Sequence, residues 1–280
     1  MSENPAAAKG PAPRAATPKS PEYAAFLRRT RRGKLAVFAT QAAILIAVLA
    51  LWEIAANHRW IDPFLTSQPS RIWETTLRMA AQGNLWLHTT VTLRETIIGF
   101  AAGLILGFGV AVALWWSDFL SRVADPYLVI LNSMPKIALG PIFYIWLGDR
   151  LSVYGMAVAI SVIVTITMLY TGFREVDPNL IKLLRTFGAT RAQVLRKAVI
   201  PASLPTLISS LKVNIGLTLV GVIVGEFLSS KAGLGYLIIY GGQVFRLDMV
   251  MMGVFVLVLL SAVLYLVVSA LESSVLRWRG

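Results

Sequence analysis

The residues of this sequence that could do chemistry are a few polar side chains inside long apolar stretches. Asn132 and Lys136 interrupt one stretch beside Pro135, Asn214 lies near the start of another, and Glu226 lies near its far end. Because lipid cannot satisfy such groups, each is a candidate for lining a translocation path or forming a gate. For Lys136 and Glu226, a structural ion pair is the alternative.

Covalent chemistry has little support in the sequence. There is no cysteine, and His58 and His88 lie far apart without a ligand pattern, so no metal site is predicted. We find no paired carboxylates and no nucleophile–base spacing. No G-x-x-x-x-G-K-[ST] phosphate loop occurs, since Gly33-Lys34 is followed by Leu35. The chain is therefore not expected to be an enzyme or to hold a cofactor.

The composition predicts a membrane protein. Of 280 residues, 56% are hydrophobic and 14% are charged, whereas a soluble domain carries about a quarter charged residues. Six segments have the roughly 20 apolar residues that cross a bilayer. They are Leu35–Ala56, Thr96–Trp116, Asp125–Leu147, Leu151–Tyr170, about Leu207–Leu228, and Met249–Leu271. We expect an all-α, polytopic helical membrane protein with about six transmembrane helices.

The distribution of Lys and Arg predicts the orientation. The net charge of +12 could suggest nucleic acid, but in a membrane protein basic residues first report topology. With the N-terminus inside, the inside segments hold 17 basic residues and the outside segments seven. Both termini are therefore expected in the cytoplasm, and nucleic acid is not an expected partner. Residues 1–34 are expected to form a disordered basic tail that attracts anionic lipid, and residues 35–280 the transmembrane domain. A cleaved signal peptide is disfavoured, because the first apolar stretch has 22 residues and exceeds a secretory core.

Small residues predict close helix packing. Gly99, Gly103 and Gly107 share one helix face, and Gly221 and Gly225 repeat the spacing. Such a strip allows another helix to approach closely.

The polar, basic segment at about 172–205 separates two predicted spans and begins with helix signals. Asp177 can cap a helix that starts at Pro178, and Gly188 can end it. The apolar face of this helix is predicted to be Leu180, Leu183, Leu184 and Phe187.

A second short helix is predicted to follow. Thr190 and Gln193 form a capping box, and Pro201 and Pro205 are expected to end the helix before the next span. Its apolar residues are Val194, Leu195, Ala198 and Val199, and the basic rim of the segment is Arg185, Arg191, Arg196 and Lys197. We interpret the segment as a docking surface for a cytoplasmic partner. A DNA-binding helix-turn-helix and a solvated basic loop are the alternatives, and the membrane spans at both ends disfavour the first.

The segment resembles the "EAA" loop of ABC-importer permeases, whose pattern is E-A-A, three residues, Gly, nine residues, then I-x-L-P. Aligned on Gly188-Ala189, the chain has Lys182-Leu183-Leu184 before it and Ala198-Val199-Ile200-Pro201 after it. Lys182 stands where the family often has glutamate. The stretches "QPSRIWETT", "TTVTLRETIIGF", "MPKIALGPIFYIWLGD" and "GEFLSSKAGLGYLI" resemble the nitrate/sulfonate/taurine branch of these permeases.

The resemblance implies a type I importer permease in the cell membrane. Two permease subunits, here a homodimer, would combine with two cytoplasmic ATPases that hydrolyse ATP and with an extracytoplasmic binding protein. The implied coupling residues are Lys182, Phe187, Gly188, Ala189, Arg191, Pro201 and Pro205. The branch implies a sulfonate, taurine or nitrate-like anion as substrate, with a thiamine pyrimidine precursor as the alternative. A secondary transporter or channel is the other class, although we find no internal repeat.

Overall fold

The fold comes from a computed structural model that describes residues 21–276, with side chains for residues 29–273. The described residues are almost entirely helical and contain no strand. The chain forms two compact units, residues 1–60 and 61–280, which are described separately. The all-α prediction is confirmed.

The first unit contains one long helix, α1 (Pro21–Asn57). The predicted tail extended to residue 34, but residues 21–34 are helical. The boundary was wrong because this part contains four Arg, two Ala and one Leu, and a helix extends readily from an apolar span into good helix formers. Residues 1–20 of the predicted tail lie outside the described residues.

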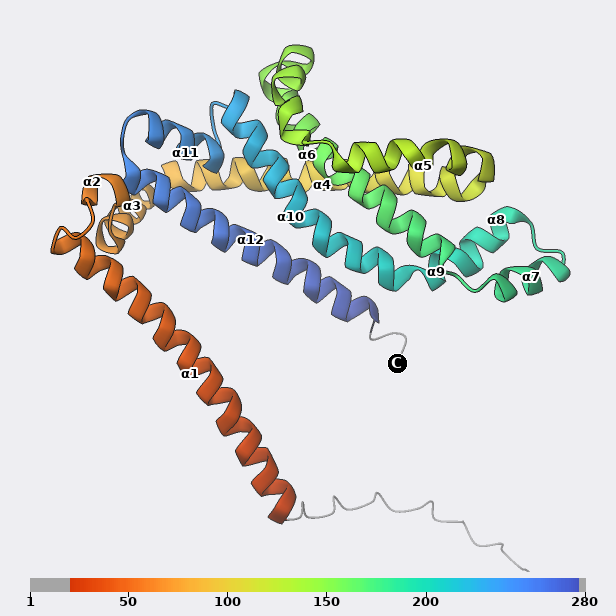
Figure 1. Ribbon diagram of the computed structural model, residues 1–280, viewed down its shortest axis with the longest axis horizontal. Helices are drawn as coiled ribbons and strands as arrows, with labels where there is room; N and C mark the ends of the chain where they lie inside the picture. The colour runs from red at the N-terminus through yellow and green to blue at the C-terminus, as the bar shows by residue number, and fades with distance from the viewer. Residues whose placement is uncertain (1–20, 277–280) are drawn as a thin grey trace, which may run out of the picture. The chain divides into compact units, whose positions relative to one another are not determined.

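The second unit contains the remaining helices (Figure 1). In order they are α2 (Pro63–Thr66), α3 (Pro69–Ala81), α4 (Asn84–Trp116), α5 (Asp118–Ser133), the 3-10 turn η1 (Lys136–Leu139), α6 (Gly140–Arg174), α7 (Pro178–Thr186), α8 (Arg191–Val194), the π turn η2 (Leu195–Val199), α9 (Ile200–Ala202), α10 (Leu204–Ser229), α11 (Leu234–Gln243) and α12 (Leu247–Leu276).

Five helices of the described chain are long and apolar enough to cross a membrane. The third expected span, Asp125–Leu147, is not one helix, because α5 ends at Ser133. Met134 is extended (φ −69°, ψ 136°), as the residue before a proline prefers, and Pro135 has no N–H to continue the helix. Farther on, Gly148 interrupts α6 with φ 72° and ψ −178°.

The core of the second unit is the contact of α4 and α10 with α6. A Cβ added at Gly107 would lie 2.6 Å from Thr165 of α6, and one added at Gly221 would lie 2.6 Å from the Cα of Ala157. No larger side chain fits where the backbones approach this closely. The predicted packing role of the glycines is confirmed.

The pairing of glycines also gives the direction of the helices. Gly99 faces Ala157 and Gly107 faces Thr165, so α4 and α6 run parallel. If both cross the membrane, the chain between them must return to the first side. Only α5, η1 and the start of α6 are available for that return, so six crossings follow although five helices qualify by length.

The second unit has two contrasting ends. Figure 1 shows α7 and α8 at one end and α11 at the other. We refer to these as the α7 end and the α11 end.

Candidate functional site

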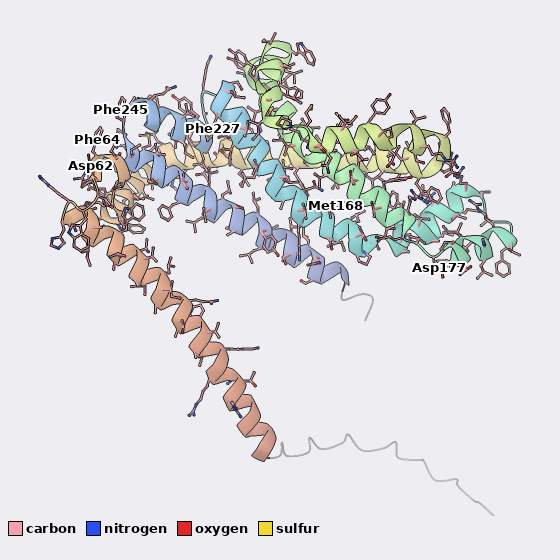
Figure 2. The ribbon with its side chains drawn as sticks, viewed as in Figure 1. Asp62, Phe64, Met168, Asp177, Phe227 and Phe245 are labelled. Carbon is pink, nitrogen blue, oxygen red and sulfur yellow. The ribbon has the colours of Figure 1, made fainter. Side chains whose placement is uncertain are left out.

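The first helix of the α7 end begins as its sequence predicts. The Asp177 carboxylate accepts a hydrogen bond from the Asn179 N–H at 2.8 Å, and Pro178 occupies the first turn. Figure 2 labels Asp177 at the start of this segment. The side chain therefore satisfies one of the N–H groups that the first turn leaves unpaired.

Gly188 ends this helix in the left-handed region, with φ 81°. The Gly188 N–H donates to the Arg185 carbonyl at 2.9 Å, and the Ala189 N–H donates to the Leu184 carbonyl at 3.0 Å. These two bonds form a Schellman cap, and the predicted glycine stop is confirmed.

The second helix also begins as predicted. Thr190 Oγ1 accepts from the Gln193 N–H at 3.3 Å, and Gln193 Oε1 accepts from the Thr190 N–H at 2.8 Å. Both bonds of the predicted capping box are present.

The end of the second helix differs from the prediction. Pro201 does not end the helix, because α8 continues through the π turn η2 into α9. The Ile200 N–H donates to the carbonyl of Leu195, five residues back. Pro201 then lies in the first turn of α9, and Pro205 lies in the first turn of α10, where a missing N–H costs little.

The inner face of the α7 end packs on the membrane-spanning helices. Leu184 and Ile181 of α7 pack against a buried cluster that includes Val194, Val199 and Phe173 of α6. Leu184 was predicted to lie on the same face as Leu180, Leu183 and Phe187, but it lies on the buried side.

The outer face of α7 is apolar and exposed. Leu180, Leu183 and Phe187 are 38%, 53% and 79% exposed. Lys182 is also exposed. We refer to these four residues as the outer α7 face. Its position at one end of the unit leaves it available to a partner.

Arg191 was predicted to lie in the basic rim of the segment, but its side chain packs on aromatic rings. Its guanidinium lies over the rings of Trp115 and Trp116, at 5.7 and 5.8 Å from their centroids. Arg191 therefore joins the second short helix to the end of α4.

The polar residues predicted to line a path fall into two groups, and the first group is near the break after α5. The Lys136 ammonium donates to the Asn132 carbonyl at 3.1 Å, at an exposed position. Asn132 and its neighbour Ser133 line a cavity of about 440 Å³ between α5 and α6.

Asn214 and Glu226, the second group, are buried in α10. The Asn214 amide donates to the Ser210 carbonyl at 2.9 Å, while its Oδ1 has no hydrogen-bond partner. The structure does not bring Asn214 or Glu226 to the cavity that Asn132 lines.

Glu226 organises the α11 end. Its Oε1 accepts from the Thr92 hydroxyl at 2.6 Å, and its Oε2 accepts from the Gly235 N–H at 2.5 Å. Thr92 in turn accepts from the Leu234 N–H at 2.8 Å.

Sequence reasoning missed the partners of Glu226. Thr92 is separated from Glu226 by 134 positions, and it belongs to no sequence pattern that indicates the pairing. No role was predicted for His88 beyond the absence of a metal site, yet its Nδ1 accepts from the Gly233 N–H at 3.0 Å. The only sequence signal for this hydrogen-bonded cluster was the presence of the charged residue Glu226 in an apolar span.

Phe64 of α2 and Phe245, between α11 and α12, lie at the α11 end. Their rings stack at 6.5 Å, and Figure 2 labels both close together. Asp248, which lines the same cavity as these rings, accepts from the Thr75 hydroxyl at 2.7 Å and pairs with Arg246 at 2.8 Å. Among the described residues, no group of His, Cys, Asp or Glu could hold a metal ion.

Comparisons with known proteins agree on one family. The profile for "Binding-protein-dependent transport system inner membrane component" matches residues 99–277. The formylaminopyrimidine transport permease protein ThiX of Halalkalibacterium halodurans is 30% identical over 84% of this chain and 93% of its own. The taurine transport system permease protein TauC of Escherichia coli is 26% identical over 84% of this chain and 88% of its own.

A solved structure shares the fold. It is an inward-facing MetNI methionine ABC transporter, whose matched chain superposes with a TM-score of 0.61 at 20% identity. The match covers 68% of this chain and 97% of that chain.

Proposed function

The chain belongs to the family of binding-protein-dependent transport system inner membrane components, and from this premise we propose which surfaces of this ABC-importer permease perform each task. Members of the family are transport permeases and not enzymes, and they are multi-pass membrane proteins. An importer permease works with an ATPase and a binding protein.

We assign ATPase docking to the outer α7 face. An exposed apolar surface of this kind marks an interaction site, and Leu180, Leu183 and Phe187 are exposed at the tip of the unit. The buried face of the same helix is fixed to Phe173 of α6, so a movement of the ATPase would be transmitted to a membrane-spanning helix. The two caps at Asp177 and Gly188 hold the helix rigid for that purpose. In this proposal ATP is hydrolysed by the partner, and this chain carries no cofactor.

Matched phenylalanine substitutions test whether the outer α7 face docks the ATPase. Phe187→Asp should abolish co-purification of the ATPase subunit and ATP-driven uptake, because it places a charge in an apolar contact. The control is Phe245→Asp, at the α11 end, where the side chain is 70% exposed. It should leave co-purification intact. If both variants bind the ATPase as the unaltered chain does, the outer α7 face is not the docking surface.

We assign the lining of the path to the cavity between α5 and α6. It holds Asn132 and Ser133 beside Thr167, so hydroxyl and amide groups face a space of about 440 Å³. A second copy of the chain, related by a two-fold axis, would complete the path in a homodimer. Lys136, Asn214 and Glu226 remain candidates for a gate, although Glu226 is bonded within its own chain.

For the substrate we propose a small organic anion of the sulfonate or taurine type. The taurine permease supports this class. At the α11 end, a cavity of about 640 Å³ is lined by Arg94, Arg150 and Lys231 together with Glu95 and Asp149, so cations exceed carboxylates. The formylaminopyrimidine permease, at slightly higher identity, supports a thiamine pyrimidine precursor as the second candidate. Thermal-shift measurement of the partner binding protein with taurine and with formylaminopyrimidine distinguishes them.

We further propose that both termini lie in the cytoplasm of the cell, on the side of the α7 end. The excess of Lys and Arg on that side supports this orientation. Reporter fusions at residue 20 and after Gly280 should both report the cytoplasm. A fusion after Gly280 that reports the periplasm would contradict six crossings.

A further inference from the structure

A basic cavity lies between the α7 end and the membrane-spanning helices. Its volume is about 310 Å³, and its walls come from α4, α5, α6, α7 and α8. The charged residues that line it are Asp118, Arg122, Arg174, Arg185 and Arg191. Four arginines and one aspartate therefore line the cavity. Within the described part of the chain, none of these four arginines forms an ion pair.

Aromatic rings hold two of these arginines at the ends of membrane-spanning helices. Arg191 lies over Trp115 and Trp116 at the end of α4, and Arg174 lies 5.8 Å from the ring centroid of Tyr170 near the end of α6. Trp and Tyr are enriched where the hydrocarbon meets the headgroups. The cavity is therefore at the depth of lipid headgroups.

The adjacent surface of α5 is apolar and exposed. Phe119 is 79% exposed and follows Asp118, which lines the cavity. Val123 is 45% exposed and follows Arg122, which also lines it. A molecule with an anionic head in the cavity could place acyl chains against these side chains. A free inorganic anion would gain nothing from them.

We propose that this cavity binds the phosphate of an anionic phospholipid, such as phosphatidylglycerol. Several guanidinium groups give the bidentate geometry that phosphate oxygens accept. Basic pockets between the cytoplasmic ends of helices attract anionic headgroups, at about fivefold in affinity per cation. Because the walls include both α7 and the ends of α4 and α6, the lipid would join the docking segment to the membrane-spanning helices. The proposal rests on the membrane placement of the α7 end and not on the substrate.

The test compares two double variants of the full chain by native mass spectrometry. Arg174→Gln with Arg185→Gln removes two charges from the cavity. Arg196→Gln with Lys197→Gln removes two charges from the neighbouring helical segment, where neither residue lines the cavity. Each protein is equilibrated with dioleoyl-phosphatidylglycerol or dioleoyl-phosphatidylcholine, and its melting temperature is measured with added inorganic phosphate.

The unaltered chain should retain phosphatidylglycerol at one molecule per chain and retain no phosphatidylcholine. The cavity variant should lose about 25-fold in affinity, and the control variant should change by less than fivefold. Folding is checked by gel filtration in phosphatidylcholine, and Arg174→Lys with Arg185→Lys should restore partial binding. Equal retention in both double variants would overturn the proposal.

Two other outcomes would also overturn it. A melting temperature raised equally by inorganic phosphate and by phosphatidylglycerol would indicate a free-anion site. Loss of ATPase co-purification in the cavity variant, with unchanged lipid retention, would assign the arginines to the partner. Lipid retention is measured without the ATPase. A failure of the lipid proposal can therefore be distinguished from a failure of the proposal that the outer α7 face docks the ATPase.

Discussion

The α7 end and the α11 end are built by opposite means. At the α7 end, each cap joins residues at most five positions apart, as in Asp177 to Asn179 and Ala189 to Leu184. At the α11 end, the bond from Thr92 to Glu226 joins residues 134 positions apart, and both side chains are buried. The first end presents an exposed apolar surface, whereas the second contains a buried polar pair, Thr92 and Glu226.

The two ends therefore suit different tasks: the α7 end suits docking of a partner, and the α11 end suits stabilising the packing of the helices. A surface that docks a partner must keep its shape without help from the rest of the fold, which local caps achieve. Where α4, α10 and α11 meet, buried polar groups need partners across the helices, since unpaired groups there are costly. We therefore expect substitutions at the α11 end to change stability and substitutions at the α7 end to change association.

The largest effect is expected for Gly233→Ala at the α11 end. Gly233 has φ 118°, and an added Cβ would clash with the Glu226 carboxyl. Backbone strain and overpacking together should cost about 2–5 kcal/mol of the free energy of unfolding. Thermal melting in detergent measures this cost. Gly242→Ala, where a Cβ meets nothing within 4 Å, is the control and should melt near the unaltered temperature.

A smaller loss of stability is expected for Thr92→Val. The substitution leaves the Leu234 N–H without its acceptor and removes a donor to Glu226, at about 1–3 kcal/mol. Thr90→Val, on the exposed side of the same helix, should cost less than about 0.5 kcal/mol. Equal melting of the two variants would show that the buried bonds do not stabilise the α11 end.

At the α7 end, Gly188→Val should lower association more than stability. A valine at φ 81° costs about 1–2 kcal/mol, and no neighbour lies within 4 Å of its Cβ. The strained cap should misplace the outer α7 face, and ATPase co-purification should fall about tenfold while the chain still inserts and dimerises. Gly188→Asn tolerates the left-handed backbone and should retain most of the association. A Gly188→Val variant with full ATPase binding and full uptake would refute the coupling role of the segment.

The smallest effect is expected for Lys182→Glu, which restores the residue that related loops often carry. Lys182 is exposed, so the free energy of unfolding should change by less than about 0.5 kcal/mol. ATPase affinity should change by no more than about fivefold, the range of an exposed ion pair. Titration of the ATPase subunit against the purified permease measures this, with Lys197→Glu as the control. A change above tenfold would mean that Lys182 lies in the centre of the contact.

The sequence predicted what local chemistry determines. The caps at Asp177, Gly188 and Thr190 are confirmed because each satisfies backbone groups within its own turn. The glycine strip of α4 is confirmed because its spacing follows the helix period. Four of the expected spans in the second unit correspond to long helices, because a long apolar run is itself a local property of the sequence.

What the sequence could not predict depends on distant parts of the chain. Whether Leu184 or Phe187 faces inward is decided by the cluster around Phe173, and the partner of Glu226 is decided by the approach of α4. The π turn before Pro201 has no sequence signal that we recognised. The break at Pro135 had a signal, but hydropathy outweighed it in the assignment of the third span.

The short length of α5 has a consequence for how the protein is made. Sixteen residues rise about 24 Å, which is less than the hydrocarbon thickness, and the last turn of the helix contains Asn132, with Lys136 just beyond the helix. On leaving the ribosome such a segment would partition poorly into lipid by itself. Its integration must await α6, whose backbone and side chains cover one wall of the cavity beside it. A nascent chain released at residue 139 should therefore hold α5 in the membrane less stably than one released after α6.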